Sequence, residues 1–308
     1  MGTPDFAVPS LRALVEFGYE VVGVFTQPDR PKGRGGKVQQ SPVKQFALAN
    51  NIPVFQPLKI RDDGIEILKN CKPDICVTAA FGQILSEEVL AVPKFGTVNV
   101  HASLLPRHRG AAPVQWAILS GDSKTGVTTM LTDKGIDTGD MLLKAETDIT
   151  DEDTAETVLS RLSTMGADLL IETIKSIENN TSIPIKQEEE LSTYDPMLKK
   201  EMGELKLDEG TQVCLNRVRA MIPWPCAYIS TNKGAMKIWA AKVAQGKTGA
   251  KIGEIIVANT KTGLIVATSD GAIELVEIQA PNSKRMTAKA YLLGHQLTEG
   301  HLISEGLV

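Results

Sequence analysis

The chain has 308 residues, of which 42% are hydrophobic and 23% are charged, and its formal net charge is −4. This is the composition of a globular protein with a sizeable core, and it excludes the disordered, collagen-like and coiled-coil classes. The sequence has no apolar run near the roughly 18 residues of a membrane span, and no basic-then-apolar leader pattern. We therefore predict a soluble, cytoplasmic protein with about two domains.

Strands and helices alternate in the first half of the chain. We predict strands at residues 21–26, 74–80, 97–100 and 127–131, and helices at residues 10–17, from Ser41-Pro42 onward, at 112–119 and at 154–178. Short runs that are apolar on both faces are typical of a parallel sheet that helices cover on both sides. The alternation predicts an open α/β sheet.

The first residues, Met1 to Phe6, have the pattern of a loop that leaves a strand and enters a helix, although no strand precedes them. A doubly wound sheet normally begins with that strand. We expect the strand to lie outside this sequence, because the chain is truncated by about half a dozen residues or because its start was assigned at an internal methionine. Its absence would put stability and activity in doubt.

The composition changes after the long helix. Residues 182–205 are polar, charged and interrupted by proline, which predicts a linker between a domain at 1–181 and a second domain at 206–308. In the second domain we predict a helix at 210–221, strands at 226–231, 236–243, 253–258, 263–268 and 272–279, and a terminal helix. Short strands separated by Gly, Asn and Asp turns suggest a small closed barrel.

The two parts of the chain differ in charge. Residues 1–205 contain 21 basic and 29 acidic side chains, whereas residues 206–308 contain 12 basic and 8 acidic ones. A basic second half is suited to a polyanionic partner. Chance variation in surface charge explains the same numbers, so the asymmetry alone does not distinguish a polyanion-binding half from an ordinary one.

The four cysteines, Cys71, Cys76, Cys214 and Cys226, form no Cys-x-x-Cys pair, and the four histidines suggest no cluster of metal ligands. Thiols of a cytoplasmic protein stay reduced. We expect four structural thiols and no metal.

Asn99 and His101 lie at the end of the predicted strand that begins at Thr97. Residues two apart on a strand project on the same side, and open α/β sheets bind ligands at the carboxyl ends of their strands. An amide donor beside an imidazole can stabilise a developing oxyanion, as in acyl transfer to an amine. A histidine that only caps a carbonyl is the alternative that these two residues leave open.

Asp137 lies between Gly135 and Gly139, after the strand predicted at 127–131. Glycines let the backbone turn sharply, which would bring the carboxylate into the same cleft. There it could orient His101 and help to accept the proton of an attacking amine. An Asx turn is the alternative, and it is weakened by the three polar residues occurring together.

Residues 28–44 contain five basic side chains and one acidic one, among glycines and prolines. We expect a flexible insertion between a strand and a helix. Such a segment is suited to nucleic-acid phosphates, because its cations displace counterions and it can order on contact. A solvated surface loop is the alternative.

The stretch Asn99-x-His101-x-Ser103-Leu-Leu-Pro106, together with Asp137, resembles the catalytic core of the formyltransferases that use 10-formyltetrahydrofolate. Further segments resemble the members of that family that act on methionyl-tRNA, namely residues 2–7, 25–30, 109–113, 137–140 and 223–225. These segments occur in order and span nearly the whole chain.

The resemblance implies a Rossmann-like domain followed by a small OB-like β-barrel that binds tRNA. It also implies transfer of a formyl group from 10-formyltetrahydrofolate to the α-amine of initiator methionyl-tRNA, and we expect a monomer. The catalytic residues would be Asn99, His101 and Asp137. The folate would be held by Ser103, Leu104, Leu105 and Pro106 and by the loop Phe81, Gly82, Gln83, Ile84 and Leu85. The tRNA would be bound by Arg30, Lys32, Arg34 and Lys37, with further candidates at Arg217, Arg219, Lys237, Lys242, Lys247 and Lys251.

Two other functions share some of these features. A formyltransferase for a sugar nucleotide or a ribonucleotide amine would use the same trio, but a small substrate needs neither the basic insertion nor a basic second half. A nucleic-acid-binding module on an inactive scaffold would not need an intact trio. A nicotinamide cofactor is not expected, because no Gly-x-Gly-x-x-Gly follows the position of the first strand.

Overall fold

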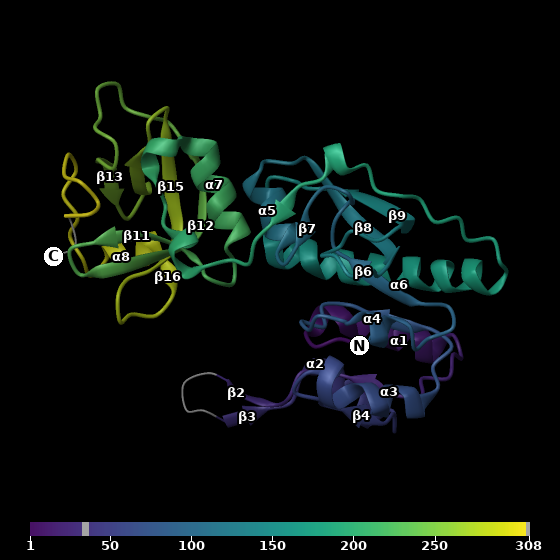
Figure 1. Cartoon of the computed structure of the whole chain (residues 1–308). Helices are drawn as coiled ribbons and strands as arrows, with labels where there is room; N and C mark the ends of the chain where they lie inside the picture. Colours follow the sequence, from purple (N-terminus) through teal and green to yellow (C-terminus); the bar gives the residue numbers. More distant parts are fainter. Residues whose placement is uncertain (33–36, 306–308) are drawn as a thin grey trace. The chain divides into compact units, whose positions relative to one another are not determined.

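The computed structural model describes residues 1–32 and 37–305, and the chain divides into two compact units (Figure 1). Unit 1 comprises Met1–Pro113, Lys124–Asp148 and Val158–Pro196. Unit 2 comprises Val114–Ser123, Ile149–Thr157 and Met197–Val308. Residues 182–196 of the segment interpreted as a linker therefore cluster with unit 1, and the rest of that segment clusters with unit 2.

The main sheet of unit 1 has four strands in the order β5-β6-β8-β9. β5 and β6 are parallel, whereas β6 and β8, and also β8 and β9, are antiparallel. The prediction of an α/β domain is confirmed, but the sheet is mixed and not parallel. The sequence could not show this, because a strand buried on both faces has the same apolar pattern in either direction. The bounds are Cys76–Thr78 (β5), Thr97–His101 (β6), Lys124–Leu131 (β8) and Met141–Asp148 (β9).

Three pairs of short strands complete unit 1. β1 and β4 are parallel, β7 and β10 are parallel, and β2 and β3 form an antiparallel hairpin. The bounds are Val24–Phe25 (β1), Arg30–Lys32 (β2), Lys37–Gln39 (β3), Val54–Phe55 (β4), Arg109–Gly110 (β7) and Tyr194–Asp195 (β10). The strands expected at 21–26 and 74–80 are thus reduced to two and three residues in β1 and β5.

The predicted helices form close to their expected bounds. Ser41 accepts a hydrogen bond from the Lys44 amide at 3.1 Å, which confirms the cap of the second helix. The helices are Val8–Glu16 (α1), Pro42–Ala49 (α2), Ile65–Cys71 (α3), Glu87–Leu90 (α4), Pro113–Leu119 (α5), Ala155–Glu178 (α6), Thr211–Ala220 (α7) and Ala288–Leu292 (α8). The sequence did not predict α3 and α4, because a helix of one or two turns has no clear period.

Short 3-10 turns and one π turn connect these elements. They are Asp5–Ala7, Ile60–Gly64 (the π turn), Glu189–Leu191, Lys200–Gly203 and Leu207–Glu209.

The long helix α6 packs on the main sheet. A Cβ atom added at Gly166 of α6 would lie 2.7 Å from Val100 of β6, so the helix approaches the sheet too closely for a larger residue. Thr173 of α6 and Thr129 of β8 share a buried hydrogen bond of 2.7 Å. The amphipathic pattern that predicted this helix therefore marks the side that covers the sheet.

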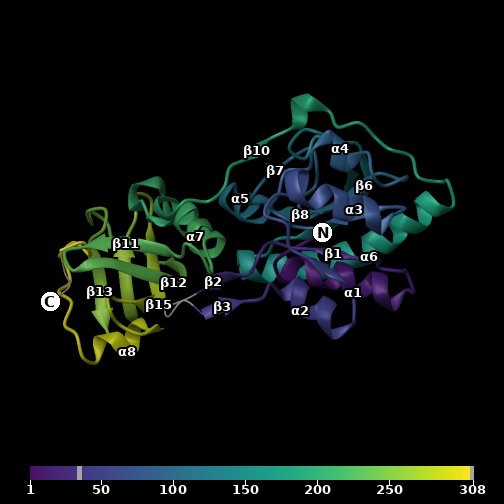
Figure 2. The same cartoon turned by 60° about the horizontal axis from the view of Figure 1, so that its bottom comes forward.

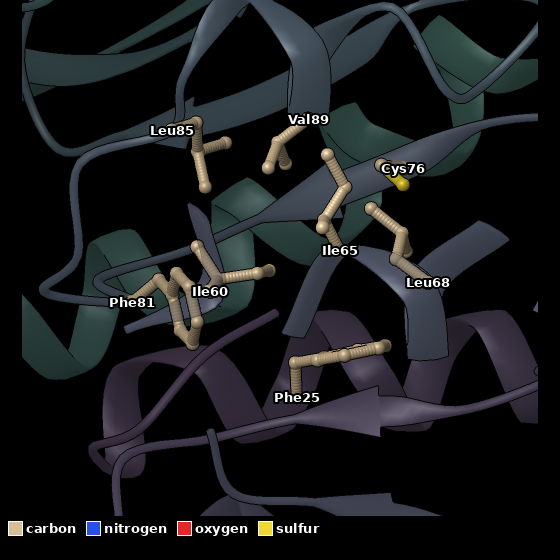
Figure 3. Close-up of a cluster of buried hydrophobic side chains, with 8 residues drawn as sticks. All are labelled: Phe25, Ile60, Ile65, Leu68, Cys76, Phe81, Leu85 and Val89. Atoms are coloured by element: carbon tan, nitrogen blue, oxygen red, sulfur yellow. The ribbon is translucent and has the colours of Figure 1, made fainter. Parts of the chain in front are cut away.

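A cluster of buried side chains lies beside β1 and β5 (Figure 3). In Figure 3, Ile65 and Leu68 of α3 lie between the strands that carry Phe25 and Cys76. The members are Phe25, Ile60, Ile65, Leu68, Cys76, Phe81, Leu85 and Val89.

Unit 2 is built on an antiparallel sheet with the path β11-β12-β15-β14-β13, to which β16 adds beside β15. The ends of the path are β11 and β13, and no pairing among the described residues joins them. The expected β-rich domain is confirmed, and the closure of a barrel is not. The bounds are Ala227–Thr231 (β11), Gly234–Ala244 (β12), Ile255–Asn259 (β13), Gly263–Ala267 (β14), Ala272–Gln279 (β15) and Met286–Thr287 (β16).

The four thiols are free, as expected. Burial raises the pKa of Cys76, Cys214 and Cys226 to about 11, so these thiols are unreactive near neutral pH. Within residues 1–32 and 37–305, no group of three or more His, Cys, Asp or Glu side chains is arranged to hold a metal ion. No helix in the same residues is long and apolar enough to cross a membrane.

Candidate active site

The structure brings Asn99, His101 and Asp137 together. Asn99 and His101 project from the end of β6, and Asp137 comes from the loop between β8 and β9. The Oδ1 atom of Asp137 lies 3.3 Å from Asn99 Nδ2 and 3.6 Å from His101 Nδ1. One carboxylate oxygen of Asp137 therefore lies near both Asn99 and His101, although Asp137 is 38 positions from Asn99 along the chain.

The Asn99 amide has a defined orientation. Its Nδ2 atom faces the Asp137 carboxylate, which can only accept hydrogen bonds. Its Oδ1 atom accepts a hydrogen bond of 3.0 Å from Thr78 Oγ1 on the neighbouring strand β5. Asn99 therefore keeps one N–H of its amide group for a ligand, because Nδ2 carries two hydrogens.

His101 is 6% exposed, and both of its ring nitrogens face acceptors. The Nε2 atom lies 2.9 Å from the backbone carbonyl of His108. A carbonyl cannot donate, so Nε2 carries a hydrogen, and Nδ1 is the ring nitrogen that faces Asp137. His101 thus caps a carbonyl, which was the alternative interpretation, and faces the carboxylate as well.

Asp137 is held in an unusual backbone conformation. Its φ angle is 54°, a left-handed region that aspartate tolerates better than most residues. The Oδ2 atom accepts a hydrogen bond of 2.9 Å from the Gly110 amide. The Asx-type contacts of this loop belong to Asp133, which accepts from the Gly135 amide at 3.0 Å, and this leaves Asp137 for the site.

Two glycines permit this loop to close. A Cβ atom at Gly139 would lie 1.7 Å from the backbone carbonyl of Leu131. Gly110 has a φ angle of 111°, and its Cβ atom would lie 2.3 Å from the carbonyl of Asp195. Both positions require glycine, so the loop and β7 can approach the site only with these residues.

Part of the predicted linker, which begins at residue 182, forms hydrogen bonds with the same loop. Gln187 Nε2 donates to the carbonyls of Asp137 at 2.7 Å and Gly139 at 2.8 Å, and its Oε1 accepts from Arg109 Nε at 2.9 Å. The Arg109 guanidinium also binds Glu189 through both of its terminal nitrogens, at 2.8 and 2.9 Å. We name residues 187–195 the strap.

The strap is fixed at its far end by a buried pair of a histidine and a carboxylate side chain. His108 Nδ1 lies 2.7 Å from Asp195 Oδ2, and both side chains are at most 7% exposed. The His108 amide also donates to Thr193 Oγ1 at 2.8 Å. Because the His108 carbonyl faces His101, this pair indirectly supports the position of the imidazole. No local pattern in the sequence indicated this pair, because its members lie 87 residues apart.

The segment Ser103 to Pro106, expected to hold folate, is mostly turned inward. Ser103 and Leu105 are fully buried, and Leu105 packs with Met130 and Met141. Thr128 Oγ1 donates to the Ser103 carbonyl at 2.7 Å and accepts from the Leu105 amide at 3.1 Å. Leu104 and Pro106 are half-buried and are the side chains of this segment that can meet a ligand.

The second expected folate segment, residues 81–85, also contains both buried and exposed residues. Phe81 and Leu85 belong to the buried cluster, and Gln83 accepts a hydrogen bond of 2.6 Å from the Ile60 amide. Gly82 is exposed, and its carbonyl accepts from Gln27 Nε2 at 3.0 Å. Ile84 is 72% exposed, so it offers an apolar surface to a ligand.

The described parts of the basic segment at 28–44 include two short strands. β2 and β3 pair Arg30 with Gln39 and Lys32 with Lys37 in an antiparallel hairpin, which projects from unit 1 in both views (Figures 1 and 2). Arg30 is exposed. Arg34 lies outside the described residues.

Two of the basic candidates in unit 2 serve the fold of that unit. Arg217 pairs with Glu209 at 2.7 Å. Arg219 donates to the carbonyls of Thr150 at 2.7 Å and Asp153 at 3.2 Å. The exposed candidates Lys242 and Lys247 lie 3.1 and 3.7 Å from Glu274 and Glu254, so part of the positive charge is balanced locally.

Comparison with protein families matches both parts of the chain. Residues 1–174 match the family described as formyl transferase, and residues 197–296 match the formyl transferase C-terminal domain.

The chain is similar to curated proteins over nearly its whole length. It is 48% identical to the methionyl-tRNA formyltransferase of Clostridium perfringens, with 98% of each chain covered. It is 45% identical to that of Acetivibrio thermocellus, which covers 99% of this chain and 98% of the relative. Among solved structures, the sugar 3N-formyl transferase WlaRD has a TM-score of 0.68 at 22% identity, with 92% of this chain and 97% of that chain covered.

Proposed function

The chain belongs to the formyl transferase family, and from this premise we propose that it transfers the formyl group of 10-formyltetrahydrofolate to the α-amine of methionyl initiator tRNA. The product is formylmethionyl-tRNA, which serves in the initiation of translation. The observation that carries the proposal is 45–48% identity to methionyl-tRNA formyltransferases along both units.

The residues present fit the folate co-substrate, which supplies the formyl group. Ile84 presents an exposed apolar side chain, suited to a flat aromatic ring, and Leu104 and Pro106 are half-buried. Asn99 keeps one N–H free for an oxygen ligand. We propose that the segments 81–85 and 103–106 hold the folate through these side chains and through backbone groups, while Ser103, Leu105, Phe81 and Leu85 fix the shape of the segments from the core.

Asn99 stabilises the oxygen on which negative charge develops when the amine attacks the formyl carbon. Removing one such donor in an acyl transfer costs about 2.7–4 kcal/mol of transition-state stabilisation. Thr78 and Asp137 hold the amide from both sides, so the donor is oriented before the reaction. No rearrangement of the amide is then needed during the attack.

Asp137 and His101 help to accept the proton that the amine loses. Free α-amines titrate at about 7.7–8.0, so a good share of the aminoacyl ester's amine is neutral near physiological pH. It can therefore attack without the help of a strong base. Asp137 Oδ1 lies 3.6 Å from His101 Nδ1, so its negative charge would stabilise the imidazolium when His101 takes up a proton. The nucleophile belongs to the substrate, and the mechanism requires no covalent enzyme intermediate.

In this proposal the tRNA is bound by the hairpin of β2 and β3 and by basic side chains of unit 2. Arg30, Lys32, Arg34 and Lys37 contact the phosphates of the acceptor arm through charge, with no base-specific information in the side chains. We propose that unit 2 is an OB-like domain, which the register shift of β12 between Ile238 and Ala241 supports, because such bulges bend strands toward closure. The enzyme acts as a monomer in the cytoplasm.

The decisive experiment is an acceptor panel. The purified protein is incubated with 10-formyltetrahydrofolate and, separately, with methionyl initiator tRNA, methionyl elongator tRNA, free methionine and nucleotide-linked amino sugars, and the formylated product is identified by mass. We expect product only with methionyl-tRNA. Product with an amino sugar instead would overturn the proposed acceptor, and binding of tRNA without any product would indicate an inactive scaffold.

A further inference from the structure

The loop that carries the second folate segment has a strained backbone. It lies between β5 and α4, and its residues Ala80 and Gly82 have φ angles of 44° and 77°. A positive φ angle is unfavourable for alanine, so the surrounding structure must hold the loop in this shape. Phe81 and Leu85 hold it through their buried side chains. Ile84 is 72% exposed, so its direction depends on how the backbone of the loop is fixed.

Gln27 binds the backbone of this loop at its strained residues. Its Nε2 atom donates to the Phe81 carbonyl at 3.3 Å and to the Gly82 carbonyl at 3.0 Å. Thr3 Oγ1 also donates to the Phe81 carbonyl, at 3.1 Å, and accepts from the Gln27 backbone amide at 3.4 Å. The two hydrogens of Nε2 can serve the two carbonyls, so one side chain fixes two consecutive peptide groups of the loop.

Gln27 is held in turn by three polar side chains at the base of the hairpin of β2 and β3. Gln56 Nε2 donates to the Gln27 carbonyl at 2.9 Å and to Asp29 Oδ1 at 2.8 Å. Lys44 Nζ donates to Asp29 Oδ2 and to Gln56 Oε1, both at 2.6 Å. The Lys44 ammonium and the Gln56 amide lower the pKa of Asp29, so its carboxylate is charged at neutral pH. We name Asp29, Lys44 and Gln56 the triangle.

The triangle also joins the two ends of the hairpin. Asp29 directly precedes β2, whereas Lys44 lies in α2, which follows β3. A second hydrogen bond, between Thr26 Oγ1 and Ser41 Oγ at 2.7 Å, links the same two ends. The side chains of Lys44 and Asp29 are 16% and 22% exposed, so salt screens this ion pair less than an exposed one. The base of the hairpin is therefore a fixed support for Gln27.

We propose that Gln27 is a positioning residue for the folate, and that the triangle keeps Gln27 in place. Gln27 touches neither the formyl group nor the amine, and it acts by fixing the backbone of residues 80–82 and hence the direction of Ile84. The inference rests on the proposed function, because it takes residues 81–85 as a folate-binding segment. Loss of the Gln27 side-chain amide should therefore weaken folate binding and leave the chemical step unchanged.

The test compares the wild type with Gln27→Met, which keeps the length of the side chain but removes its donor. Binding of tetrahydrofolate is measured by calorimetry in the absence of tRNA. We expect Gln27→Met to weaken binding by about tenfold, because two carbonyls of the loop lose a donor. In formyl transfer, KM for 10-formyltetrahydrofolate should rise by a similar factor, while kcat and KM for methionyl-tRNA stay within about twofold of the wild type.

The matched control is Gln45→Met. Gln45 is exposed, and its side-chain amide also donates to a backbone carbonyl, that of Gln40, at 3.0 Å. This variant should bind tetrahydrofolate as the wild type does. Lys44→Met tests the triangle and should weaken binding by about threefold, because Gln56 and Asp29 lose their shared cation. Unchanged binding in Lys44→Met would overturn the role of the triangle.

Equal binding of tetrahydrofolate by Gln27→Met and Gln45→Met would overturn the proposal. A fall in kcat with unchanged folate affinity would also overturn it, since Gln27 would then act on the chemical step. If Gln27→Met does not fold, Thr3→Val removes the other donor to the Phe81 carbonyl at nearly constant size, and it should weaken binding in the same direction.

The two proposals fail in different ways. A wild type that formylates no methionyl-tRNA, but binds tetrahydrofolate more tightly than Gln27→Met, would refute the proposed acceptor and support this inference. A wild type that binds no tetrahydrofolate would refute both. Hydrogen exchange at residues 80–85, with residues 263–267 of unit 2 as the internal reference, gives a readout without any ligand. Gln27→Met should accelerate exchange in the loop by about tenfold, and unchanged exchange would contradict the fixing of its backbone.

Discussion

Gln187 binds the backbone of Asp137 and not its carboxylate. Its Nε2 atom donates to the Asp137 carbonyl at 2.7 Å and to the Gly139 carbonyl at 2.8 Å. The carboxylate is thereby left for Asn99, His101 and Gly110, while the strap fixes the loop that carries it. Gln187 thus fixes the position of Asp137, although the two residues are 50 positions apart along the chain.

The first prediction concerns Gln187→Ala. The change leaves two carbonyls without their donor, and each unsatisfied group costs about 1–3 kcal/mol, so the loop should become mobile. We expect kcat to fall by about tenfold to a hundredfold, with little change in KM for the folate, because a displaced catalytic group affects the reaction more than binding. Gln296→Ala, at an exposed glutamine, is the control. Unchanged kcat in Gln187→Ala would remove the strap from the mechanism.

The second prediction concerns Asp137→Asn. The substitution preserves size but removes the charge next to His101 and places an amide where Asn99 and Gly110 both donate. We expect kcat to fall by about 10²–10⁴-fold while the thermal transition of the protein stays close to that of the wild type. Asp151→Asn, at an exposed position, should keep full activity. Near-normal turnover of Asp137→Asn would exclude the carboxylate from catalysis.

The third prediction concerns Asp195→Ala, which leaves His108 without its buried carboxylate. The change removes a buried hydrogen bond, and losing one partner of such a bond costs about 1–3 kcal/mol. We expect the free energy of unfolding, measured in urea, to fall by roughly that amount, and kcat to fall as well, because the His108 carbonyl positions His101. Glu190→Ala, at an exposed residue of the strap, should change stability by under about 0.5 kcal/mol. Equal stability of the two variants would contradict the role of the pair.

The fourth prediction concerns the basic hairpin. Replacing Arg34 and Lys37 by Ala should raise KM for methionyl-tRNA much more than KM for the folate, because only the tRNA offers a row of phosphates. The slope of log KM against log salt should become less steep, by about one for each phosphate that the variant no longer neutralises. The matched control replaces Lys59 and Arg61, exposed cations of the same unit. Equal effects on both substrates would argue against a tRNA contact.

The fifth prediction concerns pH and the amine of Met1. Burial lowers its pKa to about 6 in the folded protein, against about 8.0 when it is exposed. Between these values the unfolded chain holds a proton that the folded chain lacks, so stability increases as pH rises from 6 to 8. Two pKa units correspond to about 2.7 kcal/mol. The comparison chain carries Gly-Ser-Gly-Ser-Gly before Met1, which moves the charged amine away from Val77, and its free energy of unfolding, measured from pH 6 to 8, should lack this increase.

Other ionisable groups line the cavity of unit 1 that Met1 also lines, and they are common to both chains. They are Tyr19, Glu20, Cys71, Lys72, Asp74, Cys76 and Glu178. Burial raises the pKa of Tyr19, Cys71 and Cys76, so these groups titrate above the window. An identical pH dependence in the two chains would show that the Met1 amine is not buried in its neutral form.

Local sequence patterns predicted the elements that depend on short-range forces. The amphipathic period of α6 and the capping hydroxyl of Ser41 act within a few residues, and both elements form as expected. The strand predicted at 21–26 is longer than the observed one because a β-branched run reflects propensity, whereas a strand also needs a neighbouring strand to pair with. Only Val24 and Phe25 have that pairing.

The sequence by itself determined which side chains could do the chemistry: an amide and an imidazole two residues apart at a strand end, and a carboxylate between glycines. Only the tertiary structure decided how they are held, through Thr78, Gln187 and the pair of His108 with Asp195. The physical reason is range. Alternation along a strand fixes neighbours two residues apart, but a hydrogen bond between residues 50 or 87 positions apart depends on packing of the whole unit, which leaves no periodic trace in the chain.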